Sequence, residues 1–346
     1  MKARHNLGIA VICGAALWSA SCARKPAVDP AKLQVFKALP AVMESAGNPI
    51  TEDKVNLGRM LYYDARLSRG QDVSCNTCHA LDKYGVDDEA TSTGFKGQKG
   101  TRNSPTVYNA AGHFVQFWDG SAPTIEEQAK GPILNPVEMA MPGQKRVIQV
   151  LRSMPEYVQA FQKAFPGAKD PLTFDTVAQA IGTFERKLVT SARWDKFLGG
   201  DQTALTDREK AGLNTFLDVG CQACHSGAFM GGSVFQKLGA VKPYPDTRDL
   251  GRFDVTKQDA DKQVFKVPSL RNVEKTAPYF HDGSVKTLEV AVANMANYQL
   301  GRSLSPAEVT SIISFLKTLT GDLPSEYIKE PALPKSTAKT PKPEKG

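Results

Sequence analysis

Two short segments of the sequence share one arrangement of metal-binding residue types. Each has two cysteines separated by two residues and followed directly by a histidine: Cys75, Cys78 and His79, then Cys221, Cys224 and His225. This spacing is typical of c-type haem attachment, in which the cysteines form thioethers to the vinyl groups and the histidine gives its imidazole to the iron. The sequence therefore predicts two covalently bound haem c groups.

Other chemistries also use cysteine pairs of this spacing. A zinc site needs Cys and His in sets of four, and a thioredoxin-like motif needs a βαβ context that is missing here. Structural disulfides would need cysteines that the haems do not use. Of the six cysteines in the chain, only Cys13 and Cys22 near the N-terminus lie outside the two C-x-x-C-H segments. Two copies in one exported chain favour haem.

The N-terminal residues 1–23 have the pattern of a secretory signal peptide: basic residues, an apolar run over 7–18 and then small residues. The run is too short for a membrane span. Two processing routes are open, a lipoprotein-type cut before Cys22 that leaves a lipid anchor and a cut near Ala23 that leaves a free protein. Because c-type haem is attached outside the bacterial inner membrane, we expect the mature chain in the periplasm.

The net charge of +7 comes partly from basic residues at the two ends of the chain. Nucleic-acid binding would require a clustered basic stripe with stacking aromatics, and the sequence has none. Residues 331–346 are Pro, Lys and Thr with almost nothing apolar, so we expect a disordered tail.

A helix is expected before each haem segment. Apolar residues recur at helical spacing from Val55 to Leu61, and before the second segment Thr206 and Glu209 form a capping box while Gly220 ends the helix. The chain thus looks like a duplicated unit in which a helix leads to a haem.

The domain boundary is expected in the linker at 190–193, after a helix over 174–188. A final helix begins at Ser305 and Pro306 and ends before Gly321. The absence of a convincing hairpin or βαβ series predicts a mainly α class with long loops. The predicted organisation is a signal peptide (1–23), an N-terminal linker segment (24–50), a first haem domain (51–189), a second haem domain (190–330) and a disordered tail (331–346).

The second axial ligand of each iron decides its chemistry, because a thioether raises the potential while an open position permits reaction with a small oxidant. For the second haem we expect Met295, with His281 as the other candidate; Met230 lies too close to His225 in sequence. A core methionine is the alternative for Met295. For the first haem the choice stays open between no ligand and the candidates His113, Met139, Met141 and Met154.

Two further residues suggest reactivity at the first haem. Glu138 lies in an apolar segment and could shuttle a proton during O–O cleavage. Its alternative role is structural, since Asn135, Pro136 and Glu138 also fit the cap and first turn of a helix. Trp118 could lie between the haems or belong to the core.

From about Thr51 to Leu323 the chain resembles the bacterial di-haem cytochrome c peroxidases. Besides the two haem segments, the motifs that carry the resemblance are Asn103-Ser104-Pro105-Thr106-Val107, Gln116-Phe117-Trp118-Asp119-Gly120, Glu126-Glu127-Gln128-Ala129, Asn135-Pro136-Val137-Glu138-Met139, Ala277-Pro278-Tyr279-Phe280-His281-Asp282-Gly283 and the stretch from Met295 to Gly301. The resemblance implies two cytochrome c-like domains, the first with a peroxidatic haem on His79 and the second with a high-potential haem on His225 and Met295.

The resemblance also implies the activity. Electrons from a small periplasmic donor, a cytochrome c or a cupredoxin, enter at the second haem, pass by way of Trp118 and reduce hydrogen peroxide to water at the first. Glu138 and Gln128 match distal-pocket residues, with Glu138 as the acid–base group. Members of the family are often dimers, so a homodimer is expected.

A calcium ion between the domains is implied as well. Asn103 would contribute its side chain, and Thr276 and Pro278 their backbone carbonyls, which are the oxygen ligands that calcium prefers. His281 matches a residue beside the second haem.

One position departs from the family pattern. In many members the loop before Asn103 carries a histidine that caps the resting peroxidatic iron, and here that position is Phe95. Because phenylalanine cannot ligate iron, we expect the first haem to be five-coordinate or water-ligated and to react without prior reduction. His113 could substitute, but Phe114 and Val115 beside it favour packing.

Two other functions compete with the peroxidase. A di-haem electron carrier or redox sensor would leave Gln128 and Glu138 without a role. A di-haem oxidase that matures a protein-derived cofactor would resemble this family, but such enzymes carry tyrosine where this chain has Met295.

Overall fold

The computed structural model describes residues 26–344. The predicted signal peptide, with Cys22, lies outside the described residues. Within 26–344, none of the helices has the length and apolar character needed to cross a membrane.

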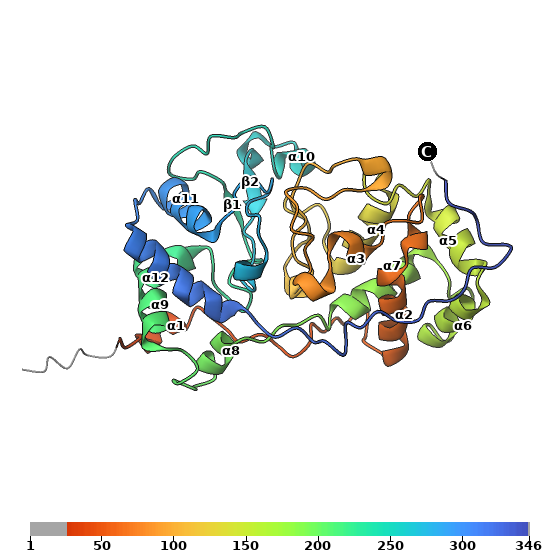
Figure 1. Ribbon diagram of the computed structural model, residues 1–346, viewed down its shortest axis with the longest axis horizontal. Helices are drawn as coiled ribbons and strands as arrows, with labels where there is room; N and C mark the ends of the chain where they lie inside the picture. Colours follow the sequence, from red (N-terminus) through yellow and green to blue (C-terminus); the bar gives the residue numbers. More distant parts are fainter. Residues whose placement is uncertain (1–25, 345–346) are drawn as a thin grey trace, which may run out of the picture.

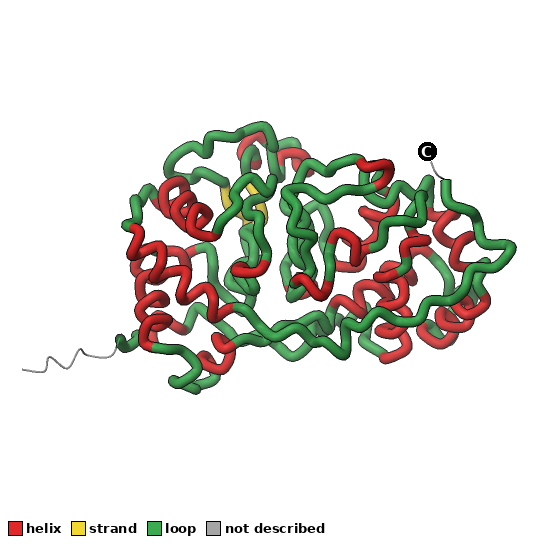
Figure 2. Tube along the Cα trace, in the orientation of Figure 1, coloured by secondary structure: helices red, strands yellow, loops and turns green. Residues whose placement is uncertain are grey.

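The architecture is helix-rich with long loops, as predicted (Figures 1 and 2). The helices are α1 Pro30–Leu33, α2 Glu52–Tyr63, α3 Cys75–Cys78, α4 Ile125–Leu134, α5 Gln144–Arg152, α6 Pro155–Ala164, α7 Phe174–Glu185, α8 Arg193–Leu198, α9 Asp207–Val219, α10 Phe253–Thr256, α11 Leu288–Leu300 and α12 Pro306–Leu316. The described chain also has one small antiparallel sheet of β1 Phe235–Lys237 and β2 Val264–Lys266. This sheet was not predicted, because its strands have three residues each and lie far apart in sequence.

The first domain is built on α2 crossing α7, with α4, α5 and α6 around them (Figure 1). Thr51 caps α2 by accepting from the Lys54 N–H, so the predicted helix is confirmed. The crossing is very close at Gly58, where an added Cβ would lie 1.9 Å from the Ala180 carbonyl oxygen. Only glycine permits this approach of the two backbones.

The second domain repeats the arrangement with α9 crossing α12. The capping box of Thr206 and Glu209 is present, and α9 ends at Gly220 with φ +102°, as predicted. At Gly212 an added Cβ would lie 2.1 Å from the Ser311 carbonyl oxygen. The duplicated unit expected from the sequence is therefore visible in both the helices and their glycine contacts.

The two ends of the chain cross between the domains, which corrects two predicted boundaries. The segment 24–50 is more than a linker: Phe36 packs on Trp194 of the second domain, and Asn48 donates to Glu126 of the first at 3.0 Å. Residues 322–330, predicted in the second domain, return to the first, where Tyr327 stacks on Phe184 at 5.1 Å. Spacing alone cannot show which core a short apolar segment joins.

The tail predicted to be disordered is ordered over residues 331–344 and lies along the first domain (Figure 1). Its backbone carbonyls accept hydrogen bonds from side chains of that domain, Arg66 to Pro334 at 2.8 Å and Gln71 to Pro341 at 2.7 Å. The prediction was wrong because the tail is held by polar groups of another segment, which its own composition cannot indicate.

Candidate active site and haem-binding segments

The first C-x-x-C-H segment is formed by α3 and the residue after it. One helical turn places Cys75 and Cys78 on the same side, directly before His79. The His79 Nδ1 lies 3.3 Å from the carbonyl oxygen of Gly85. Because a carbonyl only accepts, Nδ1 carries the proton and Nε2 is left with its lone pair, as an iron ligand requires. Burial lowers the pKa of His79, which keeps the ring neutral.

The histidine of the second segment is oriented in the same way. The His225 Nδ1 lies 3.0 Å from the carbonyl oxygen of Met230. The Met230 side chain is fully buried in the core of the second domain, so this residue contributes its backbone rather than its thioether. None of the four cysteines of the two segments is paired in a disulfide. In each segment two sulfurs and one oriented imidazole thus fit a covalently bound haem.

Glu138 lies in a turn over 136–139 that follows α4. Its Oε1 accepts from the Asn135 side chain at 2.9 Å, and burial raises the pKa of the Glu138 carboxyl. The alternative that Asn135 and Pro136 begin a helix is wrong, since Met139 instead folds back to donate to the Pro132 carbonyl at 3.2 Å. Gln128 is half-buried on α4.

Three methionines that were left open as ligands of the first haem are core residues. Met139, Met141 and Met154 are at most 4% exposed and belong to the hydrophobic cluster of the first domain. Packing therefore accounts for all three.

Phe95 is buried directly beside the Glu138 turn. Its N–H donates to the Glu138 carbonyl at 2.7 Å, and the Arg69 guanidinium lies over its ring at 5.5 Å. The preceding Gly94 is so close that an added Cβ would lie 2.2 Å from the Val137 carbonyl oxygen. The loop that the family comparison singled out is thus seated on the segment that carries the acid–base candidate.

His113 packs at the contact between the domains. Its ring meets Phe229 edge-on at 5.3 Å, and neither ring nitrogen has a hydrogen-bond partner among the described residues. Burial lowers the pKa of His113 well below its usual value. These contacts agree with the packing role favoured by the sequence.

Trp118 joins the two domains. Its Nε1 donates to the Asn103 carbonyl at 2.9 Å, and its own carbonyl accepts from the backbone N–H of Lys266 at 2.7 Å. Lys266 is buried and its Nζ donates to the Val115 carbonyl, while burial lowers its pKa to about 8. Sequence reasoning missed this lysine, although a single Lys within the apolar run 264–267 was a signal.

The residues expected at the calcium site approach one another at the same contact. The Asn103 N–H donates to the His281 carbonyl at 2.7 Å, which brings Asn103 to the loop that contains Thr276 and Pro278. The Asn103 Nδ2 donates to the Glu89 carbonyl at 3.0 Å, and its Oδ1 accepts no hydrogen bond from the residues that the structure describes. Arg102 next to it bridges the domains through Asp249, 2.6 Å away.

The candidates for the second haem lie on different elements. Met295 is half-buried on α11. His281 is 5% exposed, stacks on Phe265 with ring centroids 4.4 Å apart, and has its Nε2 3.9 Å from Asp249. His281 is thus held by the second domain at its contact with the first.

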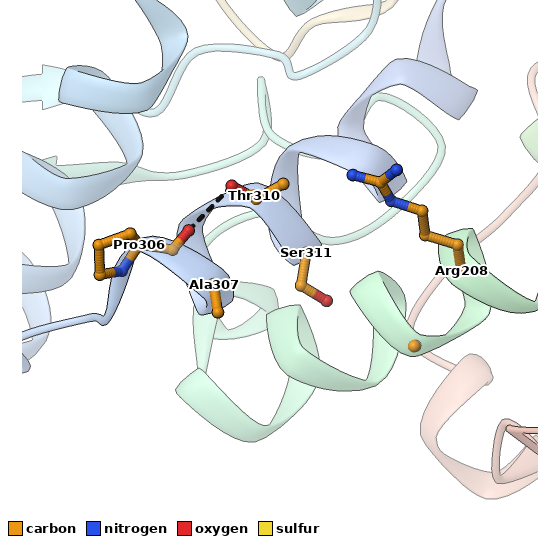
Figure 3. A pocket seen from close by; sticks show the side chains of 6 residues that line it. Arg208, Pro306, Ala307, Thr310 and Ser311 are labelled. Atoms are coloured by element: carbon orange, nitrogen blue, oxygen red, sulfur yellow. Dashed lines mark hydrogen bonds between the residues drawn. The ribbon is translucent and has the colours of Figure 1, made fainter.

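A separate hollow of about 420 Å³ lies between α9 and α12 on the second domain (Figure 3). It is open, its lining includes Arg208 and Thr310, and it contains none of the predicted site residues.

Comparison with known proteins agrees with this geometry. Residues 52–203 match the family model described as di-haem cytochrome c peroxidase. The cytochrome c551 peroxidase of Pseudomonas aeruginosa is 49% identical over 89% of this chain and 90% of that protein. The chain belongs to the di-haem cytochrome c peroxidase family. The predicted recognition and the assignment as a cytochrome-c peroxidase, an oxidoreductase with haem cofactors, are thereby confirmed.

Two other relatives show the breadth of the family. The cytochrome c551 peroxidase of Nitrosomonas europaea is 47% identical over 86% of this chain and 88% of that protein. A solved structure of a MauG-like protein associated with microbial copper homeostasis has a TM-score of 0.75 at 28% identity, covering 85% of this chain and 97% of its own.

Proposed function

We propose that the protein is a periplasmic peroxidase that reduces hydrogen peroxide to two molecules of water with two protons and two electrons. The electrons come from a small periplasmic donor, a cytochrome c or a cupredoxin, enter at the haem of His225 and Met295, and pass to the haem of His79. The observation that carries the proposal is Glu138, a half-buried carboxyl of raised pKa in the first domain, beside the loop that carries Phe95.

The bound haem supplies the redox-active iron at which the O–O bond is cleaved. Glu138 takes a proton from the incoming peroxide and returns it to the departing oxygen; its raised pKa suits both transfers near neutral pH. The Asn135 side chain holds Oε1 in place. The Gln128 amide orients the peroxide by hydrogen bonding.

Trp118 serves as the electron bridge. Its Nε1 is fixed by Asn103, and its carbonyl accepts from Lys266 of the second domain, which supports this role. Calcium bound by the Asn103 side chain and the carbonyls of Thr276 and Pro278 would hold the same contact. The homodimer and the lipid anchor at Cys22 remain predictions from the sequence.

At the position where many members of the family carry a ligating histidine, Phe95 offers the iron no ligand. We therefore infer an enzyme whose first haem is five-coordinate or water-ligated at rest and needs no reductive activation. The buried ring, packed beneath Arg69, supports this inference.

Electron paramagnetic resonance of the fully oxidised protein, before and after peroxide without reductant, tests the proposal. A high-spin signal that peroxide converts is expected. Two low-spin signals and no reaction, before and after one-electron reduction, would contradict the peroxidase and favour an electron carrier. A Phe95→His variant is the matched control, because it should turn the first haem low-spin and make its reaction depend on prior reduction.

A cofactor-maturing oxidase is the second candidate, because a MauG-like structure is among the similar folds. Met295 argues against it, since the resemblance places tyrosine at that position in such enzymes.

A further inference from the structure

The C-terminal strap, defined as residues 331–344, continues from Tyr327 and Ile328 in the core of the first domain and runs to the segments that carry Phe95 and Glu138. Its carbonyls are held by Arg66 and Gln71, and Thr337 donates to the Ser153 carbonyl at 2.8 Å. Figure 1 shows the segment passing along the first domain and ending beside α5. These contacts place the last described residue, Glu344, beside Arg69.

Arg69 connects the strap to the pocket. Its guanidinium binds the Glu344 carboxylate, with Nη2 and Oε2 2.7 Å apart, and the Glu344 N–H donates back to the Arg69 carbonyl at 3.0 Å. In the other direction the Arg69 N–H donates to the Met139 carbonyl at 2.8 Å, and its guanidinium covers the Phe95 ring. One residue thus contacts the strap, the pocket loop and the neighbour of Glu138.

Hydrogen bonds also join the loop that carries Phe95 to the turn that carries Glu138. The backbone N–H of Phe95 donates to the Glu138 carbonyl, and the Gln98 side chain donates to the carbonyls of Phe95 and Pro136 at 3.1 and 3.2 Å. The loop over 94–98 therefore cannot leave the Glu138 turn without breaking its hydrogen bonds to Glu138 and Pro136 and the Arg69–Phe95 contact.

We propose that Arg69, held by the C-terminal strap, is a positioning residue of the peroxidatic pocket, seating the Phe95 loop on the Glu138 turn and restricting entry of small ligands to the first haem. This inference rests on the proposed function only in naming the pocket as peroxidatic. It adds a role for a segment that the activity itself does not use.

The ion pair between Arg69 and Glu344 is weak. The side chains of Arg69 and Glu344 are 41% and 43% exposed, so their ion pair is weak and screened by salt. Arg146 adds a longer contact to the other Glu344 oxygen at 3.8 Å. The strap therefore shifts the loop between seated and open states rather than locking it.

The test uses the holoprotein, its variant truncated after Glu330, the variant Arg69→Gln, and Lys342→Ala as a strap control whose side chain has no ion pair or hydrogen bond among the described residues. Truncation after Glu330 leaves Tyr327 and Ile328 in the core. Cyanide association with the oxidised first haem is followed by stopped flow, and hydrogen exchange reports on residues 94–98.

Truncation and Arg69→Gln should each speed cyanide association about three- to tenfold, the size that a few exposed contacts carry, and should not add when combined. Exchange protection of the 94–98 amides should fall in the same variants, and high salt should reproduce the effect in the wild type only. Lys342→Ala should change nothing. Unchanged cyanide rates or unchanged exchange in the truncated protein would overturn the proposal.

The experiments can contradict the proposed peroxidase and the proposed role of Arg69 independently of each other. If the oxidised protein reacts with neither peroxide nor cyanide, the proposed resting state is wrong, and the seating of the loop is then decided by exchange alone. If the wild type reacts with peroxide but strap and Arg69 variants match it in both measurements, the peroxidase stands and the strap has no role in the pocket.

Discussion

The two haem-binding segments orient their histidine rings in the same way, but different residues surround them. In both, an imidazole Nδ1 is tied to a backbone carbonyl five or six residues on, and a glycine lets the two main helices of the domain cross. The first domain places a half-buried carboxyl, Glu138, beside the buried ring of Phe95; the second places Met295, half-buried, on α11. The orientation of the imidazole is thus repeated in the two domains, while the residues around it differ.

The two domains also differ in how their buried charged side chains are paired. In the second, Arg271 is 1% exposed and its two terminal nitrogens bind the Asp195 carboxylate at 2.8 Å each. In the first, Arg186 pairs with Glu126, but the adjacent Glu185 is 4% exposed and its Oε2 has no partner in residues 26–344. Burial and the nearby Glu126 raise the pKa of Glu185 to about 8. The first domain therefore carries an unbalanced acid and the second a balanced pair.

Replacing Glu138 should have the largest effect on activity, and this effect should be confined to the first haem site. Glu138→Gln should lower kcat/KM for peroxide about 10²- to 10⁴-fold, because a general acid–base is removed, while both haems remain reducible. As a base Glu138 must be deprotonated, so wild-type activity should fall at acidic pH, with an apparent pKa above the ordinary value of Glu, and the variant should lose this limb. Glu127→Gln on the exposed side of α4 is the control; equal loss there, or retained activity at position 138, would contradict the assignment.

Breaking the balanced pair should strongly destabilise the second domain. Arg271→Met leaves the Asp195 carboxylate without its cation, and we expect the free energy of unfolding to drop by about 3–5 kcal/mol. Denaturant titration of the holoprotein measures this. A double variant with Asp195→Asn should recover part of the loss; a loss below 1 kcal/mol would mean that the pair is not a buried constraint.

The shared helix crossing predicts matching effects in both domains. Gly58→Ala and Gly212→Ala should each destabilise by about 1–3 kcal/mol, since the methyl group would lie within 2.1 Å of a backbone oxygen. Thermal unfolding of each variant, monitored at the haem absorbance, tests this. Gly143→Ala, where an added Cβ meets nothing within 4 Å, serves as the control; equal stability of all three variants would break the analogy.

The unbalanced acid also predicts a dependence of stability on pH. Because the pKa of Glu185 is raised to about 8 in the folded protein, the folded state holds a proton that the unfolded state has released above the usual carboxyl pKa. Stability should therefore fall as pH rises toward and through 8, by up to about 1.4 kcal/mol per pH unit. Glu185→Gln should flatten this dependence between pH 5 and about 8 in denaturant titrations. An unchanged slope would show that Glu185 has a partner in the holoprotein.

The sequence predicted most local structure because the signals were local. Caps such as Thr206 with Glu209, and the stop at Gly220, depend only on neighbouring residues. The two C-x-x-C-H segments were also found this way. The placement of Tyr327 in the first core, and the contact of Arg69 with Phe95, depend on segments more than twenty residues apart, and neither residue's neighbours indicate them.

Failure of the tail prediction has the same origin. A segment poor in apolar residues gains little from burial, so composition predicts disorder. Here Arg66 and Gln71 supply the donors that its carbonyls need, and those residues belong to another part of the chain. Glu138 was the opposite case, since its apolar neighbours did indicate burial but not the turn that replaced a helix.

The crossing of the chain ends bears on the order in which the two cores can form as the chain is synthesised. The core of the first domain includes Ile328, so it stays incomplete until nearly the whole chain has been made. The core of the second needs only Phe36 and residues up to Leu319. Although it comes later in sequence, the second domain can close first, and the haem on the first would then be enclosed last, after the final residues arrive.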